Sequence, residues 1–535
     1  MKREKQIQQL QEDITWDVVI IGGGATGLGA AVEATTRGYK TLLLEQLDFT
    51  IGTSSRSTKL VHGGVRYLEQ GDVSMVFEAL NERGLLLKNA PHLVSNQTFL
   101  IPSYAIWQKP FYTIGLIIYD ILSGRKSFGK SRPFSRRNTI KKLPNLIRKN
   151  LRGGITYHDG QFDDARLGLN LAQTAIEKGA TVLNYVKVQD LLKKNNKIIG
   201  VVAEDQETEK RYAIKAKSVI NATGVFADAI LKKDNPKAKK VIQPSQGVHI
   251  VIDAKFLQSD YALLIPKTKD GRILFAVPWH DKVILGTTDE PKEKPVIEPK
   301  ATEKEIDFIL ETASRYLINK PTRKDIKSVF AGLRPLVLPG DDESTKEISR
   351  SHKILVSKSK LISIIGGKWT TYREMGEDVI DKMEKVFNLP KKESITEHLK
   401  IHGYQKNTDF SNPLYFYGSD LAKIKELIKE DNSLSELLSE KLKINKAQVV
   451  FAVQNEMARN AYDFLARRTR ALFLDAYEAV RIAPKVIQIM AKELKKDTLW
   501  EQEERTKFKK IAKEYLITLN NIDEKQTRFR YDKKI

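Results

Sequence analysis

Cysteine is absent from the sequence. The chain therefore has no disulfide framework, no cysteine-ligated zinc or iron–sulfur cluster and no catalytic thiol. Long apolar runs are absent as well, so no segment is expected to span a bilayer. The first residues, MKREKQIQQLQED, lack the apolar core and the small-residue cleavage site of a secretory signal. These absences favour an intracellular protein that is soluble or attached to a surface.

Negative charge is scarce relative to positive charge. The 535 residues include 90 Lys and Arg against 67 Asp and Glu, which gives a formal net charge of +23. Nucleic acid, an anionic membrane surface or an anionic small substrate would each suit this excess, and solvated lysine-rich faces account for part of it. The length predicts two to four domains at roughly 150 residues each. The 41% hydrophobic content excludes a disordered chain.

Strands and helices alternate through the first part of the chain. Residues 16–21 form a β-branched apolar run that leads into a glycine turn and an Ala-rich helix closed by Gly38. Residues 39–46 predict a second buried strand, and residues 247–290 predict an antiparallel sheet. From about residue 391 the composition becomes charged and helical, so a domain boundary is expected near residue 395.

Gly22, Gly24 and Gly27 form a G-x-G-x-x-G motif between the first predicted strand and its helix. Gly22 permits the tight turn, Gly24 lets a pyrophosphate approach the backbone, and Gly27 lets the helix pack against the strand. The amino end of the helix then faces the phosphates. Glu45, about 20 residues further on, would accept the ribose hydroxyls. The pattern predicts a dinucleotide site, and the alternative is an ordinary glycine turn of an α/β protein.

Two later segments favour FAD over NAD as the dinucleotide. A predicted strand ends in Asn221-Ala222-Thr223-Gly224, and Gly366-Gly367-Lys368 opens a late helix. FAD is long, so a chain that folds around it needs backbone from distant segments. NAD is more often held by one contiguous unit.

Residues 53–68, TSSRSTKLVHGGVRYL, form a dense polar loop that is too hydrophilic for a core. This loop resembles the signature of the FAD-dependent, respiratory (aerobic) glycerol-3-phosphate dehydrogenase family and its oxidase relatives. Trp369 and Val225-Phe226 depart from the family pattern at positions that affect packing. Further matches follow in chain order over nearly the whole sequence, at residues 163–167, 247–249, 286–289, 331–336, 349–350, 366–373 and 463–470.

The resemblance implies an α/β fold of three parts. An FAD-binding Rossmann-like domain is expected from roughly residues 15–105, 150–245 and 350–395. It is interleaved with an antiparallel-sheet substrate-binding domain of the glutathione-reductase and amino-acid-oxidase type, expected at residues 106–149 and 246–349. An all-α C-terminal domain, residues 396–535, is expected to cap the catalytic part or to mediate self-association, as in a homodimer.

The same resemblance implies FAD as the cofactor, bound noncovalently because a cysteinyl link is impossible in this chain. No metal ion is expected. The expected FAD-binding residues are Gly22, Gly24, Gly27, Glu45, Thr53, Ser54, Ser55, Lys59, Leu60, His62, Val186, Ala222, Thr223, Gly224, Gly367, Lys368 and Thr370.

The implied reaction oxidises sn-glycerol 3-phosphate to dihydroxyacetone phosphate. A hydride leaves C2 for flavin N5, a base removes the C2 hydroxyl proton, and the electrons pass to a quinone in the membrane. The phosphate dianion calls for clustered arginines. The expected substrate-binding residues are Arg66, Tyr67, Arg334 and Arg350.

Three residues are expected to take part in the chemistry. Arg334 is expected closest to the reacting carbon and Lys368 beside the flavin, and His249 is the residue type best suited to acid–base work near neutral pH. The identity of the base stays open, and His62 is expected to be a flavin neighbour rather than a base. An ion-paired surface arginine and a core histidine are the plain alternatives for Arg334 and His249.

Residues 104–122 are rich in aromatic residues and isoleucine, and a strongly basic tract, residues 124–154, follows them. The apolar run is too short to span a bilayer but suits an interfacial helix on an anionic leaflet. The alternative is a core helix followed by a solvated basic loop. With the resemblance, the pattern predicts a cytoplasmic enzyme on the inner face of the plasma membrane.

Other functions remain to be separated from this one. An oxidase that passes electrons from the same substrate to O2 is the nearest alternative, followed by an amine-oxidising flavoprotein and a binding protein without chemistry. Nucleic acid is not expected as a partner, because no helix-turn-helix, zinc module or RNA-binding signature is present.

Overall fold

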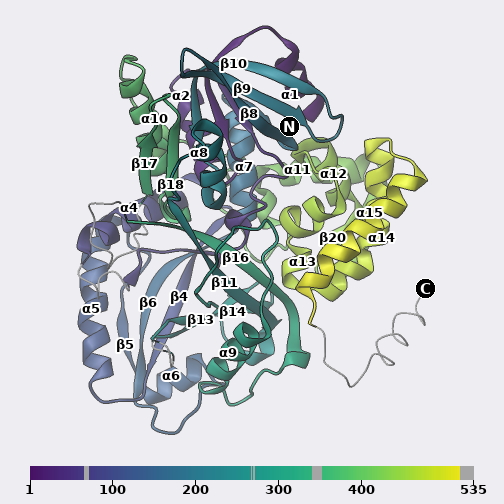
Figure 1. The fold of residues 1–535 in the computed structure, drawn as a ribbon. Coiled ribbons are helices and arrows are strands. Elements are labelled where there is room, and N and C mark those ends of the chain that lie inside the picture. The colour runs from purple at the N-terminus through teal and green to yellow at the C-terminus, as the bar shows by residue number, and fades with distance from the viewer. Residues whose placement is uncertain (66–71, 267, 269–270, 340–351, 518–535) are drawn as a thin grey trace.

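The computed structural model describes residues 1–65, 72–266, 268, 271–339 and 352–517. Two β-sheets lie one above the other, and a helical C-terminal part lies beside them (Figure 1). Arg66, Tyr67 and Arg350, which were expected to bind substrate, lie outside the described residues.

The first sheet is built around β1 (Thr15–Ile21), which runs parallel to β2 (Thr41–Leu44) and β10 (Arg211–Asn221). Val18 and Ile20 enter the core on one face, and Val19 and Ile21 enter the core on the other. Burial on both faces explains the uninterrupted apolar run in the sequence. The remaining strands are β7 (Thr181–Leu183), β8 (Val186–Lys194), β9 (Lys197–Asp205), β17 (His352–Val356) and β18 (Ile362–Gly366).

Helices cover both faces of this sheet. On one face α2 (Ala25–Thr36) packs against α7 (Asp164–Glu177) and α10 (Tyr372–Val386). A Cβ at Gly29 would lie 2.7 Å from the Tyr372 carbonyl oxygen, so the missing side chain allows α2 and α10 to approach closely. The other face is covered by β8 and β9 with α1 (Arg3–Gln8) and α8 (Ala227–Asp234). The predicted Rossmann-like architecture is confirmed.

The second sheet is antiparallel except where β4 runs parallel to β12. Its residues 60–61, 94–103 and 153–162 belong to segments that the sequence assigned to the FAD-binding domain, so the proposed domain limits do not follow the sheets. The sheet consists of β3 (Leu60–Val61), β4 (Val94–Ser103), β5 (Arg132–Ser135), β6 (Gly153–Phe162), β11 (Ile242–Asp253), β12 (Ala262–Ile265), β13 (Leu274–Trp279), β14 (Lys282–Gly286), β15 (Glu290–Pro291) and β16 (Ile326–Val337).

Helices also cover the second sheet on both faces. α9 (Glu303–Ser314) and the residues just after α6 (Arg136–Lys142) pack on one face. α4 (Val73–Asn89) and α5 (Gln108–Ser123) pack on the other, and α5 forms the left edge of the molecule in Figure 1. No helix among the described residues is both long and apolar enough to cross a membrane.

The C-terminal part is helical, as predicted, apart from a small hairpin of β19 (Leu437–Ser439) and β20 (Ile444–Asn445). A π-helical turn, Asp463–Arg468, lies against the first sheet's domain. Phe416 and Phe451 share one core with α2, α7 and α10, so this part is packed directly onto the nucleotide-binding unit. Its helices are α11 (Leu421–Glu430), α12 (Lys446–Glu456), α13 (Ala471–Leu474), α14 (Ala476–Leu494) and α15 (Thr498–Ala512).

His402 joins this C-terminal part to α7. Its ring nitrogens lie 2.5 Å from a Glu177 carboxylate oxygen and 2.6 Å from an Asp420 carboxylate oxygen. Burial lowers the pKa of His402, but the bonds to Asp420 and Glu177 outweigh burial and raise it to about 9. The protonated ring therefore bridges the two parts at neutral pH.

Replacing this histidine should give a pH-dependent loss of stability. Because the folded-state pKa is raised, the stabilisation is fully present below about pH 6.5 and is lost as the pH rises through about 9. We expect His402→Gln to lower the free energy of unfolding by about 2 kcal/mol at pH 6 and by little at pH 10. Urea unfolding at both pH values measures this, with the exposed His398→Gln as the control. An equal loss at both pH values would contradict the bridge.

Candidate active site

The turn between β1 and α2 opens onto a large cavity. Gly22 has a φ of 111°, and a Cβ there would lie 2.7 Å from the Ala222 carbonyl oxygen. A Cβ at Gly27 would lie 1.9 Å from the Gly22 carbonyl oxygen, so these two positions admit only glycine. Gly24 precedes the first turn of α2 and offers no capping side chain. The amino end of α2 therefore faces the cavity as backbone, which suits a pyrophosphate.

Glu45 lies at the end of β2 on the wall of this cavity. Its carboxylate oxygens accept hydrogen bonds from the Gly23 N–H at 2.6 Å and the Leu47 N–H at 2.9 Å. Burial raises the pKa of Glu45, although these N–H groups oppose the shift. The acid thus stands beside the glycine turn, where the motif predicted it, and its contact with ribose hydroxyls stays a prediction.

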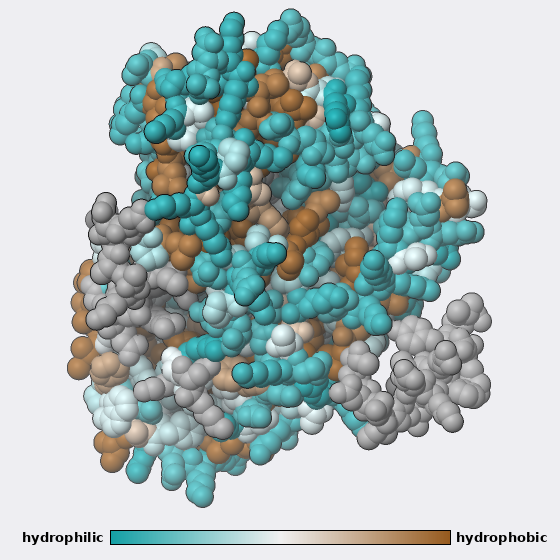
Figure 2. All heavy atoms as spheres, in the orientation of Figure 1, coloured by the Kyte–Doolittle hydropathy of each residue, from teal (hydrophilic) through white to brown (hydrophobic). Residues whose placement is uncertain are grey.

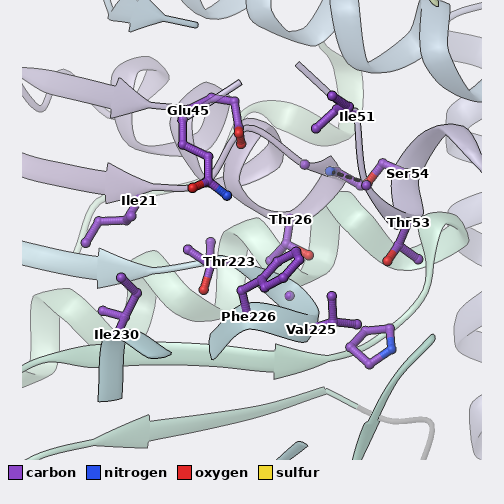
Figure 3. A pocket seen from close by; sticks show the side chains of 18 of the residues that line it. Ile21, Thr26, Glu45, Ile51, Thr53, Ser54, Thr223, Val225, Phe226 and Ile230 are labelled. Carbon is purple, nitrogen blue, oxygen red and sulfur yellow. Dashed lines mark hydrogen bonds between the residues drawn. The ribbon is translucent and has the colours of Figure 1, made fainter. Parts of the chain in front are cut away.

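The cavity has a volume of about 1470 Å³, counted with its opening, and gathers segments that are distant in sequence. In Figure 3, Thr223, Val225 and Phe226 face it from the loop after β10, and Thr53 and Ser54 face it from the polar loop. The Ser54 hydroxyl accepts a hydrogen bond from the Ala25 N–H at 2.9 Å. The predicted cofactor residues on its wall are Gly22, Gly24, Glu45, Thr53, Ser54, Ala222, Thr223, Gly224, Gly367 and Lys368.

This donor set fits a long dinucleotide. Glycines with positive φ, Gly224 at 57° and Gly367 at 85°, expose backbone at two further points of the wall. The lining thus combines a helix amino end, small hydroxyls and one acid, drawn from separate strands of the first sheet. A single contiguous unit would not provide this length of wall.

Other predicted cofactor residues lie behind the walls. Val186 is buried and donates its N–H to the Glu45 carbonyl oxygen, while its neighbours Lys187 and Val188 line the cavity. Ser55 bonds to the Thr50 hydroxyl at 2.9 Å, and Thr370 accepts from the His62 N–H at 3.3 Å. These residues shape the loops that meet the cavity.

Lys59 differs most from its expected role. Its ammonium group lies 2.8 Å and 2.7 Å from the two Asp164 carboxylate oxygens and donates to the Ser55 carbonyl at 2.6 Å. The side chain is fully buried and lines neither cavity. A charge held this way fixes the polar loop internally, so the structure gives no support to cofactor binding by the Lys59 side chain.

A second cavity, with a volume of about 960 Å³ including its opening, is lined by residues from several strands of the second sheet. Leu60, His62 and Arg334, all predicted site residues, line it. Arg334 and Pro335 are consecutive on β16, and Pro335 lines the first cavity. The two cavities therefore adjoin at the end of β16.

Two arginines stand at this second cavity, each held by a carboxylate. Arg334 lies 3.0 Å from Asp289 and donates to the Thr287 hydroxyl at 3.1 Å. Arg272 lies 3.0 Å from Glu290, the residue next to Asp289. Fixing guanidinium groups in this way orients their donors for an anion.

His249 is near the second cavity but not on its wall. The ring is buried, stacks on Phe330 with centroids 4.9 Å apart, and has Nε2 2.9 Å from the Thr58 hydroxyl. Burial, with the charges of Arg334 and Lys59, lowers the pKa of His249 well below its usual value. The His249 ring is therefore uncharged at neutral pH. Thr58, whose hydroxyl contacts this ring, lies on the wall of the second cavity, so it links His249 to that cavity. Its role as the base stays a prediction.

The sequence missed several residues that line the second cavity. Thr287 and Asp289 belong to the matched stretch 286–289, and Thr58 belongs to the polar loop, so a motif-based signal existed for these three. Arg272 and Asp159 had no such signal, because only the pairing of distant strands brings them to the cavity. Within the described residues, no group of three or more acidic or histidine side chains is arranged to hold a metal ion.

Comparison with known proteins identifies the two parts of the chain. A model of the family described as FAD dependent oxidoreductase matches residues 17–373. The family described as the C-terminal domain of alpha-glycerophosphate oxidase matches residues 358–505. The first match covers more than half of the chain.

The similar proteins extend over nearly the whole sequence. The mitochondrial glycerol-3-phosphate dehydrogenase of Schizosaccharomyces pombe is 38% identical over 595 aligned positions, which cover 98% of this chain and 91% of the relative. The human mitochondrial glycerol-3-phosphate dehydrogenase is 38% identical and covers 94% of this chain and 74% of the relative.

Comparison with solved structures points to the same family. The crystal structure of the glycerol-3-phosphate dehydrogenase from Bacillus halodurans complexed with FAD superposes with a TM-score of 0.80 at 30% identity, covering 97% of this chain and 99% of that one. An L-alpha-glycerophosphate oxidase from Mycoplasma pneumoniae shares the fold, with a TM-score of 0.55 at 17% identity over 72% of this chain and 98% of that one. The chain therefore belongs to the FAD-dependent glycerol-3-phosphate dehydrogenase family, and its cofactor is FAD.

Proposed function

We propose that the protein oxidises sn-glycerol 3-phosphate to dihydroxyacetone phosphate on a noncovalently bound FAD and passes the electrons to a quinone. The observation that carries this proposal is the pair of carboxylate-held arginines, Arg334 and Arg272, in a cavity that adjoins the dinucleotide cavity. A phosphomonoester needs such cations beside the redox centre. The names of the similar proteins supply the substrate.

When bound, FAD supplies the acceptor for the hydride that leaves C2. The chain's own residues bind and orient the substrate. Arg334, fixed by Asp289 and Thr287, offers its guanidinium to the phosphate or to the oxygen on C2. The C2 hydroxyl proton must also leave, and Thr58 with neutral His249 behind it is one route from the cavity. Lys368, on the wall of the first cavity, adds a further positive charge near the cofactor.

An oxidase that reduces O2 to hydrogen peroxide is the second candidate. The observation that favours it is the match of residues 358–505 to the C-terminal domain of alpha-glycerophosphate oxidase. Both candidates share the substrate and the first half-reaction. They differ only in what reoxidises the reduced protein.

An anaerobic titration tests the proposal. Glycerol 3-phosphate should bleach the visible absorbance of the FAD-loaded protein, whereas glycerol should not, because it lacks the phosphate that the arginines bind. Slow recovery of the colour in air and rapid recovery with a soluble quinone would identify the dehydrogenase. Rapid recovery in air with hydrogen peroxide would identify the oxidase. A yellow protein that neither compound bleaches would contradict the substrate.

Arg334 provides a second test. We expect Arg334→Gln to lower kcat/KM for glycerol 3-phosphate about 10- to 100-fold, because a charge-assisted contact is lost. Arg334→Lys keeps the charge but not the planar fork, so its kcat/KM should be intermediate. The matched control is Arg323→Gln, since Arg323 is also 27% exposed and paired with carboxylates but lines neither cavity. Equal steady-state kinetics for the two glutamine variants would contradict the assignment.

We also propose that α5 attaches the protein to an anionic membrane surface, at the cytoplasmic face of the plasma membrane. α5 and the residues before it expose an apolar stripe, which is brown at the left edge of Figure 2. Asp120 is the one acidic residue between residues 104 and 152. The exposed residues of this stripe are Ile106, Trp107, Phe111, Ile114, Ile117, Ile118 and Ile121.

The segment that follows α5 carries many exposed basic residues. These basic side chains lie on β5, on α6 and on the segments beside them. An anionic leaflet would attract each of them by about 1 kcal/mol. The apolar stripe and this basic surface together form the pattern of an interfacial helix. The exposed basic residues are Lys126, Lys130, Arg132, Arg136, Arg137, Lys141, Lys142, Arg148, Lys149 and Arg152.

Charge placed in the stripe should weaken membrane binding. We expect the double variant Ile114→Glu, Ile121→Glu to bind vesicles of phosphatidylglycerol and phosphatidylcholine at least about tenfold more weakly, because two apolar side chains are lost from the interface. Sedimentation with vesicles measures this. Ile395→Glu, at a position exposed to a similar degree outside α5, is the control. Undiminished binding of the double variant would exclude α5 as the attachment site.

A further inference from the structure

The inner face of α5 reaches the wall of the second cavity through Tyr119. The Tyr119 hydroxyl accepts a hydrogen bond from the Gly63 N–H at 2.8 Å. It lies 2.9 Å from both carboxylate oxygens of Asp159 and donates its proton to that carboxylate. Gly63 lies between His62 and Gly64, and both of these line the cavity. Asp159 itself lines the cavity as well.

This contact belongs to a closed, buried network. Arg83 on α4 lies 2.5 Å from Asp159 and donates to the Ser123 hydroxyl at 3.4 Å. The Ser123 hydroxyl in turn donates to the Tyr119 carbonyl oxygen at 3.0 Å. Burial, together with the Asp159 carboxylate, raises the pKa of Tyr119 well above its usual value. The phenol therefore stays protonated and keeps its donor role across the physiological pH range.

The network leaves the loop little freedom at Gly63. A Cβ at this position would lie 2.4 Å from a Leu80 methyl group and 2.5 Å from the Tyr119 hydroxyl oxygen. The Gly63 backbone is thus pressed against α4 and α5, and its N–H donates to the Tyr119 hydroxyl oxygen at 2.8 Å and, at the longer distance of 3.3 Å, to an Asp159 carboxylate oxygen. A shift of Tyr119 would have to move the residues on both sides of Gly63.

The same helix carries the apolar stripe on its other side. Leu116 and Tyr119 are each 1% exposed, whereas Ile114 and Ile121 are 62% and 71% exposed. A helix of about 10 Å diameter separates the two faces. Whatever the outer face binds is therefore one helix away from the cavity wall.

We propose that Tyr119 is a positioning residue that fixes the His62–Gly64 backbone and conveys docking of α5 on an anionic lipid surface to that wall. This backbone lines the second cavity, and its His62 N–H donates to Thr370, next to Trp369 on the wall of the FAD cavity. The cofactor part of this inference rests on the family assignment, and the lipid part rests on the membrane docking proposed above. Docking holds the outer face of α5, and the buried bonds of Tyr119 transmit a displacement of that helix to the loop.

The experiment uses the FAD-loaded full-length protein and the variant Tyr119→Phe, which keeps the ring and removes the hydroxyl. The matched control is Tyr39→Phe. The Tyr39 hydroxyl is also buried and donates, at 2.9 Å, to a carboxylate, that of Glu384, which is paired with Arg37. Tyr39 lines neither cavity. Three quantities are measured without substrate: binding to phosphatidylglycerol vesicles, the FAD dissociation constant, and the flavin absorbance spectrum with and without the vesicles.

We expect Tyr119→Phe to bind vesicles like the unmodified protein and to bind FAD about 3- to 10-fold more weakly, the size of one lost hydrogen bond. Vesicles should shift the flavin spectrum of the unmodified protein and of Tyr39→Phe, but not that of Tyr119→Phe. Ser123→Ala, which removes a weaker contact of the same network, should reduce the vesicle-induced shift partially.

Two results would overturn the proposal. One is a vesicle-induced spectral shift in Tyr119→Phe equal to that of Tyr39→Phe. The other is an unmodified protein that binds vesicles without any change in its flavin spectrum. Because no substrate is present, these results are independent of whether glycerol 3-phosphate is oxidised. If the unmodified protein does not bind the vesicles at all, the binding assay shows that the proposed membrane docking is itself wrong.

Discussion

The fold depends on one buried carboxylate, Asp48, which is clamped between two arginines of the C-terminal part. Arg467 Nε and Arg468 Nη1 each lie 2.5 Å from the same Asp48 oxygen, and all three side chains are buried. Burial alone would raise the pKa of Asp48, but the two guanidinium groups lower it. Leaving such a carboxylate unpaired costs about 3–5 kcal/mol. Removing the C-terminal part would therefore destabilise the nucleotide-binding unit.

Asp48 matters for the site because of its place in the chain. It lies between Glu45 and the loop that supplies Thr53 and Ser54 to the first cavity. The clamp thus fixes one wall of the FAD cavity from outside, although neither Arg467 nor Arg468 lines that cavity. The C-terminal part thus stabilises the wall of the FAD cavity, a role that its charged, periodic sequence did not indicate.

The start of α7 repeats this arrangement. Asp163 caps the helix through the Arg166 N–H and lies 2.8 Å from Arg470, while Asp164 holds Lys59. Arg166 pairs with Glu456 at 2.7 Å. Adjacent carboxylates thus fasten the polar loop on one side and the C-terminal part on the other. The stretches 163–167 and 463–470, which carried the family resemblance, line neither cavity and act through these pairs.

The parts of the structure that the sequence predicted well are those whose determinants are local. The β1–glycine–α2–β2 unit depends on residues within about 30 positions of one another, and the glycines and Glu45 lie where the motif places them. The second sheet depends on pairings such as Thr98 with His158, so the sequence alone did not indicate that β4 and β6 belong to this sheet. The ion pair of Lys59 was not foreseen for the same reason, because its partner Asp164 is 105 residues away.

The ion pairs in the structure show that the excess positive charge of the chain is divided among several separate places. Arg166, Arg467 and Arg468 are neutralised inside the protein, and Arg334 and Arg272 are oriented toward a cavity by carboxylates. The basic residues that follow α5 in the chain remain exposed to solvent, as do the apolar residues of the stripe on α5. A net charge of +23 therefore describes no single surface. The buried arginines hold the parts of the protein together, whereas the exposed basic residues after α5 are the part of the charge that fits the proposed contact with an anionic bilayer.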